Sequence, residues 1–303
     1  MKHGRILCGV LALWVLCVSA SGEDFQAKPI KNIVYKTVDG KELKLNLFLP
    51  VKGEKRFTNV PLLIFIDAGC WYSGEPGSGG MWGGWGAIQR GFAVASVPHR
   101  SAKEVPFPAQ IEDTKAAIRF LRAHADAYGI DKTRFAVMGC SSGGHISCML
   151  GIPDQVRTFD VGENLDQSSQ VQRVINFYGP TDLKYMLENS HCIPCIYQTI
   201  AGTGPDGKIP TKLTPEQMEH ARVCSPMAYV SRDFAPTLNL YGVMDRTVPI
   251  SQGVRFYEAL YRAGVRTEMY VSNRGVHSVK SIADNETLAA MVFKFLEWDG
   301  VQE

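Results

Sequence analysis

Hydrophobic and polar residues alternate near the start of this chain. Leucines occupy every second position of residues 43–49, after a short apolar stretch at 33–37 and the pair Asp39-Gly40. Alternation is typical of a strand with one covered face, and Asp-Gly favours a tight hairpin turn. This part of the chain therefore predicts an antiparallel hairpin, and the residues before it, 21–32, predict a loose polar tail.

Further along, the apolar runs are continuous, as expected for strands that are covered on both faces. Helical spacing of apolar residues appears between them. The runs are residues 62–66, 92–97, 134–138, 174–178, 237–241 and 267–271, and the clearest helical stretches are 109–125, 254–263 and 288–298. Alternating strands and helices predict an α/β fold with a mostly parallel central sheet flanked by helices. One domain is expected over residues 21–303, with an insertion at about 183–223 that lacks a strand pattern.

The first 20 residues are expected to be a secretory signal peptide. A basic start with Lys2 and Arg5 precedes an apolar run over 6–18 and the small residues Ser19-Ala20. An uncleaved membrane anchor is the alternative, but the run is shorter than the roughly 20 residues that a spanning helix needs. We therefore expect a secreted or periplasmic protein that is not held at a membrane after cleavage.

Composition excludes several classes of protein. With 303 residues, 45% of them hydrophobic and 20% charged, the chain is too apolar for a disordered protein. Eight cysteines are too few for a disulfide scaffold. Removing Lys2 and Arg5 leaves 30 basic and 30 acidic residues, so no basic surface for nucleic acid is expected.

The strongest chemical signal is Gly139-Cys140-Ser141-Ser142-Gly143 between an expected strand and an expected helix. Gly-x-Ser-x-Gly in this context forms a tight turn that exposes a nucleophilic serine above the sheet edge. Ser141 is therefore the candidate nucleophile. An ordinary glycine-rich turn is the alternative.

A serine nucleophile needs a base, and in this architecture the chain order is serine, acid, histidine. His145 lies in the same helix as Ser141 and cannot fold back to it. His191 and His220 lie in the expected insertion. His277 follows the last strand at the sheet edge where Ser141 lies, so it is the candidate base.

Asp245 is the candidate acid. It follows the buried run 237–241 and so lies at the carboxyl end of a strand, where it can orient His277. Asp182 follows Gly-Pro-Thr, where a carboxylate more often caps a helix. Asp233 precedes its strand and lies at the wrong end.

Acyl transfer also needs N–H groups that stabilise an oxyanion. Ser142 supplies one at the start of its helix. Gly69 and Cys70, in the loop after the run 62–66, are the best candidates for the others. Trp71 and the aromatic residues of the following glycine-rich loop, Trp82 and Trp85, are candidates for substrate contacts; the alternative for this loop is a lid that contacts nothing.

These residues resemble a known family, from about Lys41 to Trp298. The matching motifs are Gly139-x-Ser141-x-Gly143-Gly144-His145, Phe107-Pro108-Ala109, 177–183, Ser225-Pro226, 242–249 and Gly275-x-His277. The chain resembles α/β-hydrolase carboxylesterases that include secreted bacterial feruloyl and acetyl-xylan esterases, near the lipase branch with a His-Gly-Gly-Gly oxyanion loop. The resemblance implies a serine esterase without cofactor or metal, acting on small-molecule or polysaccharide esters.

One departure from the family pattern concerns the oxyanion loop. Asp67-Ala68-Gly69-Cys70-Trp71 stands where the family has His-Gly-Gly-Gly-Trp. An anion at Asp67 and a side chain at Cys70 predict a slower enzyme or an altered acyl pocket, because one lost oxyanion donor lowers the rate on the order of 10²–10³. A catalytically impaired binding protein is therefore one alternative to an esterase. A peptidase related to prolyl oligopeptidases is another.

The insertion carries three cysteines, Cys192, Cys195 and Cys224. With His220 they resemble the spacing of a zinc site, but in an exported protein a disulfide that involves Cys224 is the favoured prediction. Cys148 is expected to pack as a small apolar residue.

Overall fold

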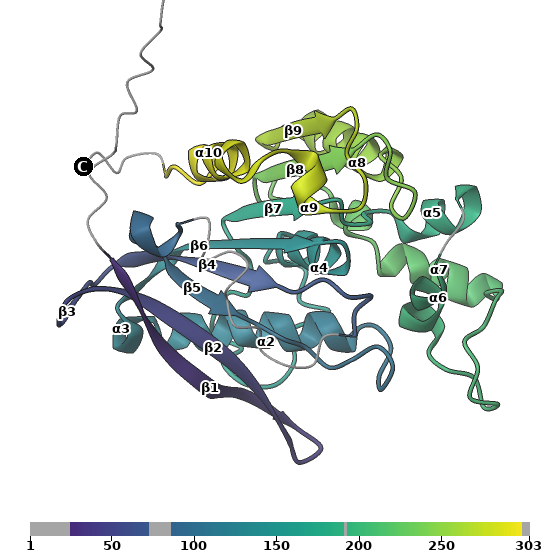
Figure 1. Ribbon diagram of the computed structural model, residues 1–303. Helices are drawn as coiled ribbons and strands as arrows, with labels where there is room; N and C mark the ends of the chain where they lie inside the picture. Colours follow the sequence, from purple (N-terminus) through teal and green to yellow (C-terminus); the bar gives the residue numbers. More distant parts are fainter. Residues whose placement is uncertain (1–24, 73–85, 191–192, 299–303) are drawn as a thin grey trace, which may run out of the picture.

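The computed structural model describes residues 25–72, 86–190 and 193–298. It begins with an antiparallel ribbon of β1 (Gln26–Val38) and β2 (Lys41–Lys52), to which β3 (Lys55–Arg56) adds a short bridge. Asp39 and Gly40 have φ values of 49° and 76°, the left-handed backbone that a two-residue hairpin turn requires. The predicted hairpin is confirmed (Figure 1).

The prediction of a loose tail over residues 21–32 is wrong from Gln26 onward, because β1 starts there and pairs with β2 as far as Val51. Its side chains up to Pro29 are exposed. Backbone pairing with β2 holds this segment, and an exposed edge strand leaves no apolar pattern in the sequence.

The remaining strands form one sheet with the ribbon. They are β4 (Val60–Ile66), β5 (Ala93–Ser96), β6 (Ile130–Cys140), β7 (Arg173–Phe177), β8 (Thr237–Gly242) and β9 (Thr267–Ser272). The order is β1-β2-β5-β4-β6-β7-β8-β9, antiparallel up to β5 and parallel from β5 to β9. This confirms the predicted α/β fold class with its mostly parallel sheet and its N-terminal antiparallel hairpin.

Helices cover both faces of the sheet. In β6 every side chain from Phe135 to Cys140 is buried, although successive side chains point to opposite faces. The helices outside the insertion are η1 (Ile88–Arg90), α2 (Ala109–Ala123), α3 (Ala125–Tyr128), α4 (Ser142–Leu150), η2 (Pro226–Tyr229), α8 (Ser251–Arg262), α9 (Val279–Ile282) and α10 (Asn285–Phe295). Within the described ranges, none of the helices is both long and apolar enough to cross a membrane.

Residues 183–223 contain α5 (Leu183–Asn189), α6 (Pro194–Ala201) and α7 (Pro215–Val223). Figure 1 shows these helices on the side of the molecule toward which the arrows of β4 and β6 point. Asp182 caps α5 by accepting a hydrogen bond from the Tyr185 amide, and Thr214 with Gln217 forms a capping box on α7.

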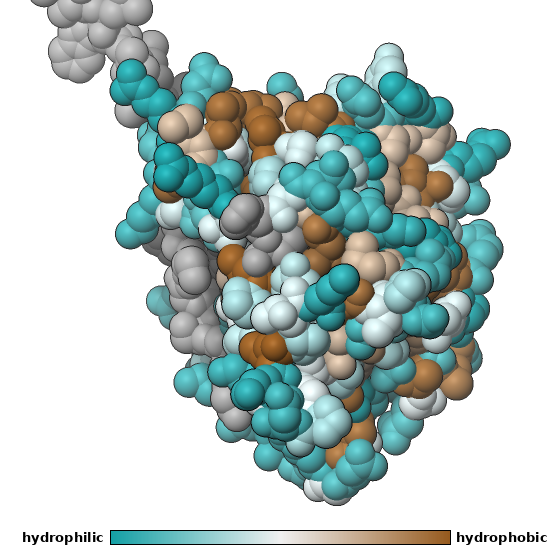
Figure 2. Space-filling view, turned by 90° about the vertical axis from the view of Figure 1, so that its right-hand side faces the viewer, coloured by the Kyte–Doolittle hydropathy of each residue, from teal (hydrophilic) through white to brown (hydrophobic). Residues whose placement is uncertain are grey.

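The parallel strands place several loops at one edge of the sheet. Ser141 follows β6 directly, Asp245 lies three residues after β8, and His277 lies five residues after β9. The loop after β4 begins at Asp67. Figure 2 faces the side that carries α5 to α7, where apolar residues form several separate groups among polar ones. The carboxyl edge of the sheet is where α/β folds collect their functional groups.

Candidate active site

Ser141 lies in the tight turn between β6 and α4. Its φ of 55° and ψ of −122° are rare for a residue with a side chain. Its amide donates a hydrogen bond to the Phe177 carbonyl at 2.9 Å, and its carbonyl accepts one from the His145 amide at 3.0 Å. This strained backbone, held at both ends, presents the hydroxyl at the sheet edge.

Glycines allow the turn to pack against neighbouring backbone. A Cβ at Gly139 would lie 2.4 Å from the Gly143 carbonyl carbon, and a Cβ at Gly143 would lie 2.3 Å from the Ile66 oxygen. No side chain fits at these distances, so both positions of the predicted Gly-x-Ser-x-Gly motif are sterically required.

The structure brings together the three residues that the sequence assigned to a catalytic triad. His277 Nε2 lies 2.9 Å from Ser141 Oγ, and His277 Nδ1 lies 2.7 Å from Asp245 Oδ2. Because a carboxylate only accepts, Nδ1–H donates to Asp245 and Nε2 is left to accept from the serine hydroxyl. This arrangement lets His277 remove the proton from Ser141.

Asp245 is oriented by the backbone beside it. Its Oδ1 accepts hydrogen bonds from the amides of Thr247 at 2.8 Å and Val248 at 3.0 Å, so its other oxygen faces His277. The carboxylate is fully buried, whereas the His277 side chain is 23% exposed. The buried carboxylate can therefore stabilise an imidazolium without competition from water.

Three contacts that the sequence did not reveal hold the His277 loop. The ring of Tyr178 packs against the imidazole with centroids 4.6 Å apart. Gly242 at the end of β8 touches the loop so closely that a Cβ there would lie 2.2 Å from the Gly275 oxygen. Met244 N also donates to that oxygen at 2.9 Å. The loops that carry Asp245 and His277 are therefore packed and hydrogen-bonded to each other.

The candidate oxyanion hole lies beside Ser141. The amides of Gly69, Cys70 and Ser142 have no hydrogen-bond acceptor within the described part of the chain. Gly69, Cys70 and Trp71 have φ values of 124°, 60° and 59°, so this loop turns through left-handed backbone. Free amides at this edge are the donors that an oxyanion requires.

Trp71 joins the oxyanion loop to helix α4. Its Nε1–H donates to His145 Nδ1 at 3.0 Å, and His145 Nε2–H donates to the Cys224 carbonyl at 2.7 Å. Trp71 is only 3% exposed, so its ring packs in the core and holds the loop against α4. It does not occupy the substrate-facing position that the sequence predicted. Burial lowers the pKa of His145 to about 4, which keeps its ring neutral.

Asp67, the residue that replaces the family's loop histidine, is partly buried at the end of β4. Burial raises the pKa of its carboxyl group. Desolvation therefore disfavours the charged form of Asp67 relative to an exposed aspartate.

The other candidates from the sequence lie elsewhere. Asp182 caps α5 and pairs with Arg255 at 3.0 Å, as expected of a cap, and Asp233 is exposed before β8. His220 lies on α7 with its ring 5.6 Å from that of Phe107. His191, Trp82, Trp85 and the expected signal peptide lie outside the described residues.

The prediction of a disulfide that involves Cys224 is wrong. Cys224 is a free, completely buried thiol, and burial raises its pKa well above the usual value. The residues after α7 hold it in the core beside α4, where its carbonyl accepts from His145. Among the residues with described positions, no group of three or more His, Cys, Asp or Glu side chains could hold a metal ion. Cys192 lies outside the described ranges.

The fold is similar to that of solved esterases. A truncated carbohydrate esterase from gut microbiota superposes with a TM-score of 0.74, at 24% identity, over 90% of this chain and 98% of the other. A thermophilic esterase from Thermogutta terrifontis gives a TM-score of 0.67, at 24% identity, over 90% of this chain and 89% of the other.

Curated relatives carry similar names. Esterase LipC of Mycobacterium tuberculosis is 29% identical over 213 residues, which are 69% of this chain and 50% of that protein. Isoprenylcysteine alpha-carbonyl methylesterase ICME of Arabidopsis thaliana is 23% identical over 257 residues, 84% of this chain and 57% of that protein. The chain thus spans about half the length of the curated relatives it matches.

Sheet order, nucleophile turn and strand-end loops together define an α/β hydrolase. Within that class the chain belongs to the BD-FAE family, whose sequence pattern matches residues 45–260. The resemblance to α/β-hydrolase carboxylesterases is therefore confirmed.

Proposed function

We propose that this protein is a serine carboxylic-ester hydrolase that forms an acyl-enzyme on Ser141. The observation that carries the proposal is the continuous chain from Ser141 Oγ through His277 to Asp245, at 2.9 and 2.7 Å. The esterase names of relatives that share the fold support the same activity.

The geometry supports a two-step reaction. Ser141 Oγ attacks the ester carbonyl carbon while His277 Nε2 accepts its proton, and the amides of Gly69, Cys70 and Ser142 stabilise the oxyanion. His277 then protonates the departing alcohol oxygen as the ester C–O bond breaks. Water attacks the acyl-enzyme with His277 again as the base, which releases the carboxylic acid and restores Ser141.

The proposed substrates are acetyl or feruloyl esters of plant polysaccharides, or other small esters. Support comes from the carbohydrate esterase that shares the fold over 98% of its length and from the BD-FAE family match. The proposed location is secreted or periplasmic, supported by the basic start and apolar run of the first 20 residues.

The activity is tested with p-nitrophenyl acetate and the variant Ser141→Ala. Turnover is expected to fall on the order of 10⁶-fold, because the nucleophile is lost. Ser231→Ala is the matched control, since Ser231 precedes β8 and lies at the opposite edge of the sheet. Unchanged turnover in Ser141→Ala would show that Ser141 is not the nucleophile. A panel of acetylated xylan, feruloylated sugars and aminoacyl amides then separates a polysaccharide esterase from a peptidase.

A second candidate function, a binding protein with impaired catalysis, is favoured by the replacement at Asp67 and Cys70. A fluorophosphonate probe separates the two candidates because it labels only an activated serine. Labelling of the wild type but not of Ser141→Ala supports the esterase. No labelling of the wild type supports the binding protein.

A further inference from the structure

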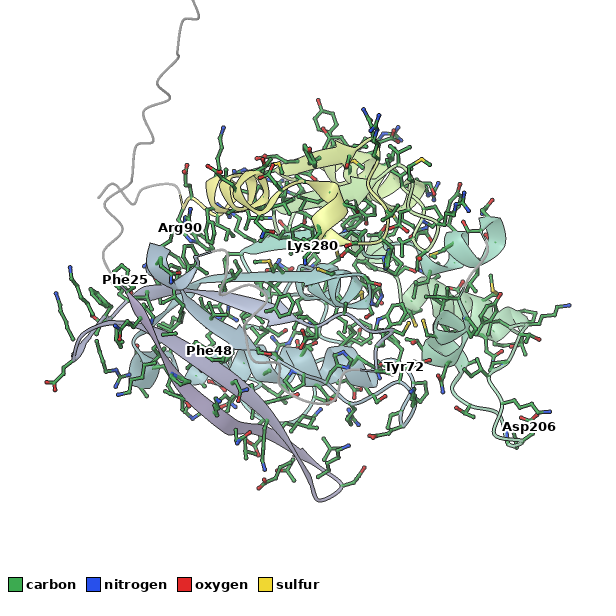
Figure 3. All side chains as sticks on the ribbon, viewed as in Figure 1. Phe25, Phe48, Tyr72, Arg90, Asp206 and Lys280 are labelled. Carbon is green, nitrogen blue, oxygen red and sulfur yellow. The ribbon has the colours of Figure 1, made fainter. Side chains whose placement is uncertain are left out.

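The oxyanion loop rests on helix α6 of the insertion. Tyr72 Oη donates a hydrogen bond to Gln198 Oε1 at 2.6 Å, and Gln198 in turn donates to Thr203 Oγ1 at 3.0 Å. Tyr72, labelled in Figure 3, lies on the side of the molecule that carries α6. Cys195 is three residues before Gln198 on this helix and therefore on the same face.

Cys70 and Cys195 meet at this contact. The side chains of Cys70 and Cys195 interact, and neither thiol is in a disulfide. Cys70 has a φ of 60°, a region that strongly favours glycine and is strained for a cysteine. Its side chain is thus held in a rare backbone conformation at a point where it touches a second thiol.

The two thiols differ in access and in charge. Cys195 is 4% exposed, whereas Cys70 is only half-buried. The interaction with Cys195, together with His277 and Lys103, lowers the pKa of Cys70 to about 7, and the same interaction raises the pKa of Cys195. Partial exposure, a lowered pKa and a neighbouring thiol are the features of a cysteine that can exchange with a disulfide.

The remaining described cysteines lack this environment. Cys140, Cys148 and Cys224 are buried, and burial raises the pKa of each. Of the five cysteines that the structure describes, only the pair that links the loop after β4 to α6 thus has this environment.

We propose that Cys70 and Cys195 are a redox modification site and form a disulfide when a small disulfide or a disulfide-donating oxidoreductase is present. The Cys70 thiolate attacks one sulfur of the oxidant and releases the first thiol. The Cys195 thiolate, formed by loss of its proton, then attacks Cys70 Sγ and releases the second thiol. Two cysteine thiols are oxidised to one disulfide while the oxidant disulfide is reduced to two thiols.

The cross-link ties the oxyanion loop to the insertion. Gly69 and Cys70 supply amides to the proposed oxyanion hole. A bond from Cys70 Sγ to α6 would restrain these amides through the insertion, in addition to the hydrogen bond of Trp71 to α4. The effect on turnover rests on the proposed function. The bond itself does not, and it is detected without any substrate.

Peptide mapping tests the bond. The purified chain is equilibrated in buffers of reduced and oxidised glutathione, its thiols are alkylated, and its peptides are analysed by mass spectrometry. The expected result is a peptide pair joined through Cys70 and Cys195, whose share rises with oxidised glutathione while both residues lose alkylation together. Cys148 and Cys224 serve as internal controls and should remain thiols in the folded protein.

The variant Cys195→Ser separates a pair from two independent thiols. Without its partner, Cys70 should accumulate as a mixed disulfide with glutathione, which in the wild type is resolved. The proposal is overturned if glutathione modifies Cys70 to the same extent in the wild type and the variant. It is also overturned if Cys195 forms a disulfide with Cys192, or if Cys195 is alkylated at every ratio of reduced to oxidised glutathione.

Discussion

The indole Nε1–H of Trp71 donates a 3.0 Å hydrogen bond to Nδ1 of His145, and this contact joins the loop after β4 to the helix that starts beside Ser141. Since indole can only donate, His145 must accept through Nδ1 and donate through Nε2 to the Cys224 carbonyl. One neutral ring thereby links the loop that carries Gly69 and Cys70 to the helix that starts at Ser142.

The variant Trp71→Phe removes this hydrogen bond and leaves His145 Nδ1 buried without a donor. We expect a loss of about 1–3 kcal/mol in the free energy of unfolding, measured with urea. We also expect a lower kcat with little change in KM, because oxyanion donors act mainly in the transition state. Trp298→Phe is the control, since Trp298 Nε1 has no hydrogen-bond partner among the described residues. Equal effects in both variants would contradict the bracing role.

His145 should make the protein less stable in acid. Burial lowers its pKa from 6.5 to about 4 in the folded state, while the unfolded chain keeps the ordinary value. Below pH 6.5 the unfolded state binds the extra proton, so stability that is fully present above pH 6.5 is lost as the pH falls toward 4. The slope approaches about 1.4 kcal/mol per pH unit within this window. Urea unfolding from pH 4 to 8 should show a shallower slope in His145→Gln, and identical slopes would contradict this assignment.

Replacing Asp245 with Asn keeps the size of the side chain but removes the carboxylate that fixes the His277 tautomer. The expected result is a fall in kcat on the order of 10⁴. Asp182→Asn is the matched control, because Asn still caps α5 and Asp182 is not in contact with His277. If Asp182→Asn were the more damaging change for turnover, the acid would be misassigned.

Gly242→Ala tests the close packing of the two loops. The new Cβ would lie 2.2 Å from the Gly275 oxygen, so the His277 loop must shift. We expect kcat to drop on the order of 10²-fold and the free energy of unfolding to fall by about 1–3 kcal/mol. At Gly204 the added Cβ would lie 3.0 Å from the end of the exposed Asp206 side chain, which can move, and 3.4 Å from the Lys208 oxygen, an ordinary contact, so Gly204→Ala should be nearly neutral. A crystal structure of Gly242→Ala with an unmoved His277 would refute the argument.

The nucleophile turn could be predicted because its motif is contiguous in the chain. Gly139 is needed for the approach of the Gly143 backbone four residues on, whereas Gly143 is needed for the approach of Ile66 at the end of β4, a contact that the structure reveals. His277 and Asp245 could be assigned because the carboxyl ends of parallel strands share one edge. Chain order and strand direction are enough to place both side chains at that edge.

The role of Trp71 could not be predicted from the sequence. An aromatic residue beside an oxyanion loop is as compatible with a substrate surface as with a core, and only the position of His145 on α4 decides between them. Cysteine spacing likewise does not say which thiols lie at bonding distance, so the predicted disulfide of Cys224 was wrong. Its burial beside α4 and the contact of Cys195 with Cys70 depend on how the insertion packs.

By itself, the sequence determined the α/β fold class, the strand-turn-helix that exposes Ser141 and the residues able to serve it as base and acid, because periodicity and glycine positions act over short stretches of chain. The tertiary structure alone decided which side chains meet: Tyr178 on His277, Gly242 on Gly275, Trp71 on His145 and Cys70 on Cys195. These pairs join segments far apart in the chain, and their contacts depend on the packing of whole elements, which no local pattern records.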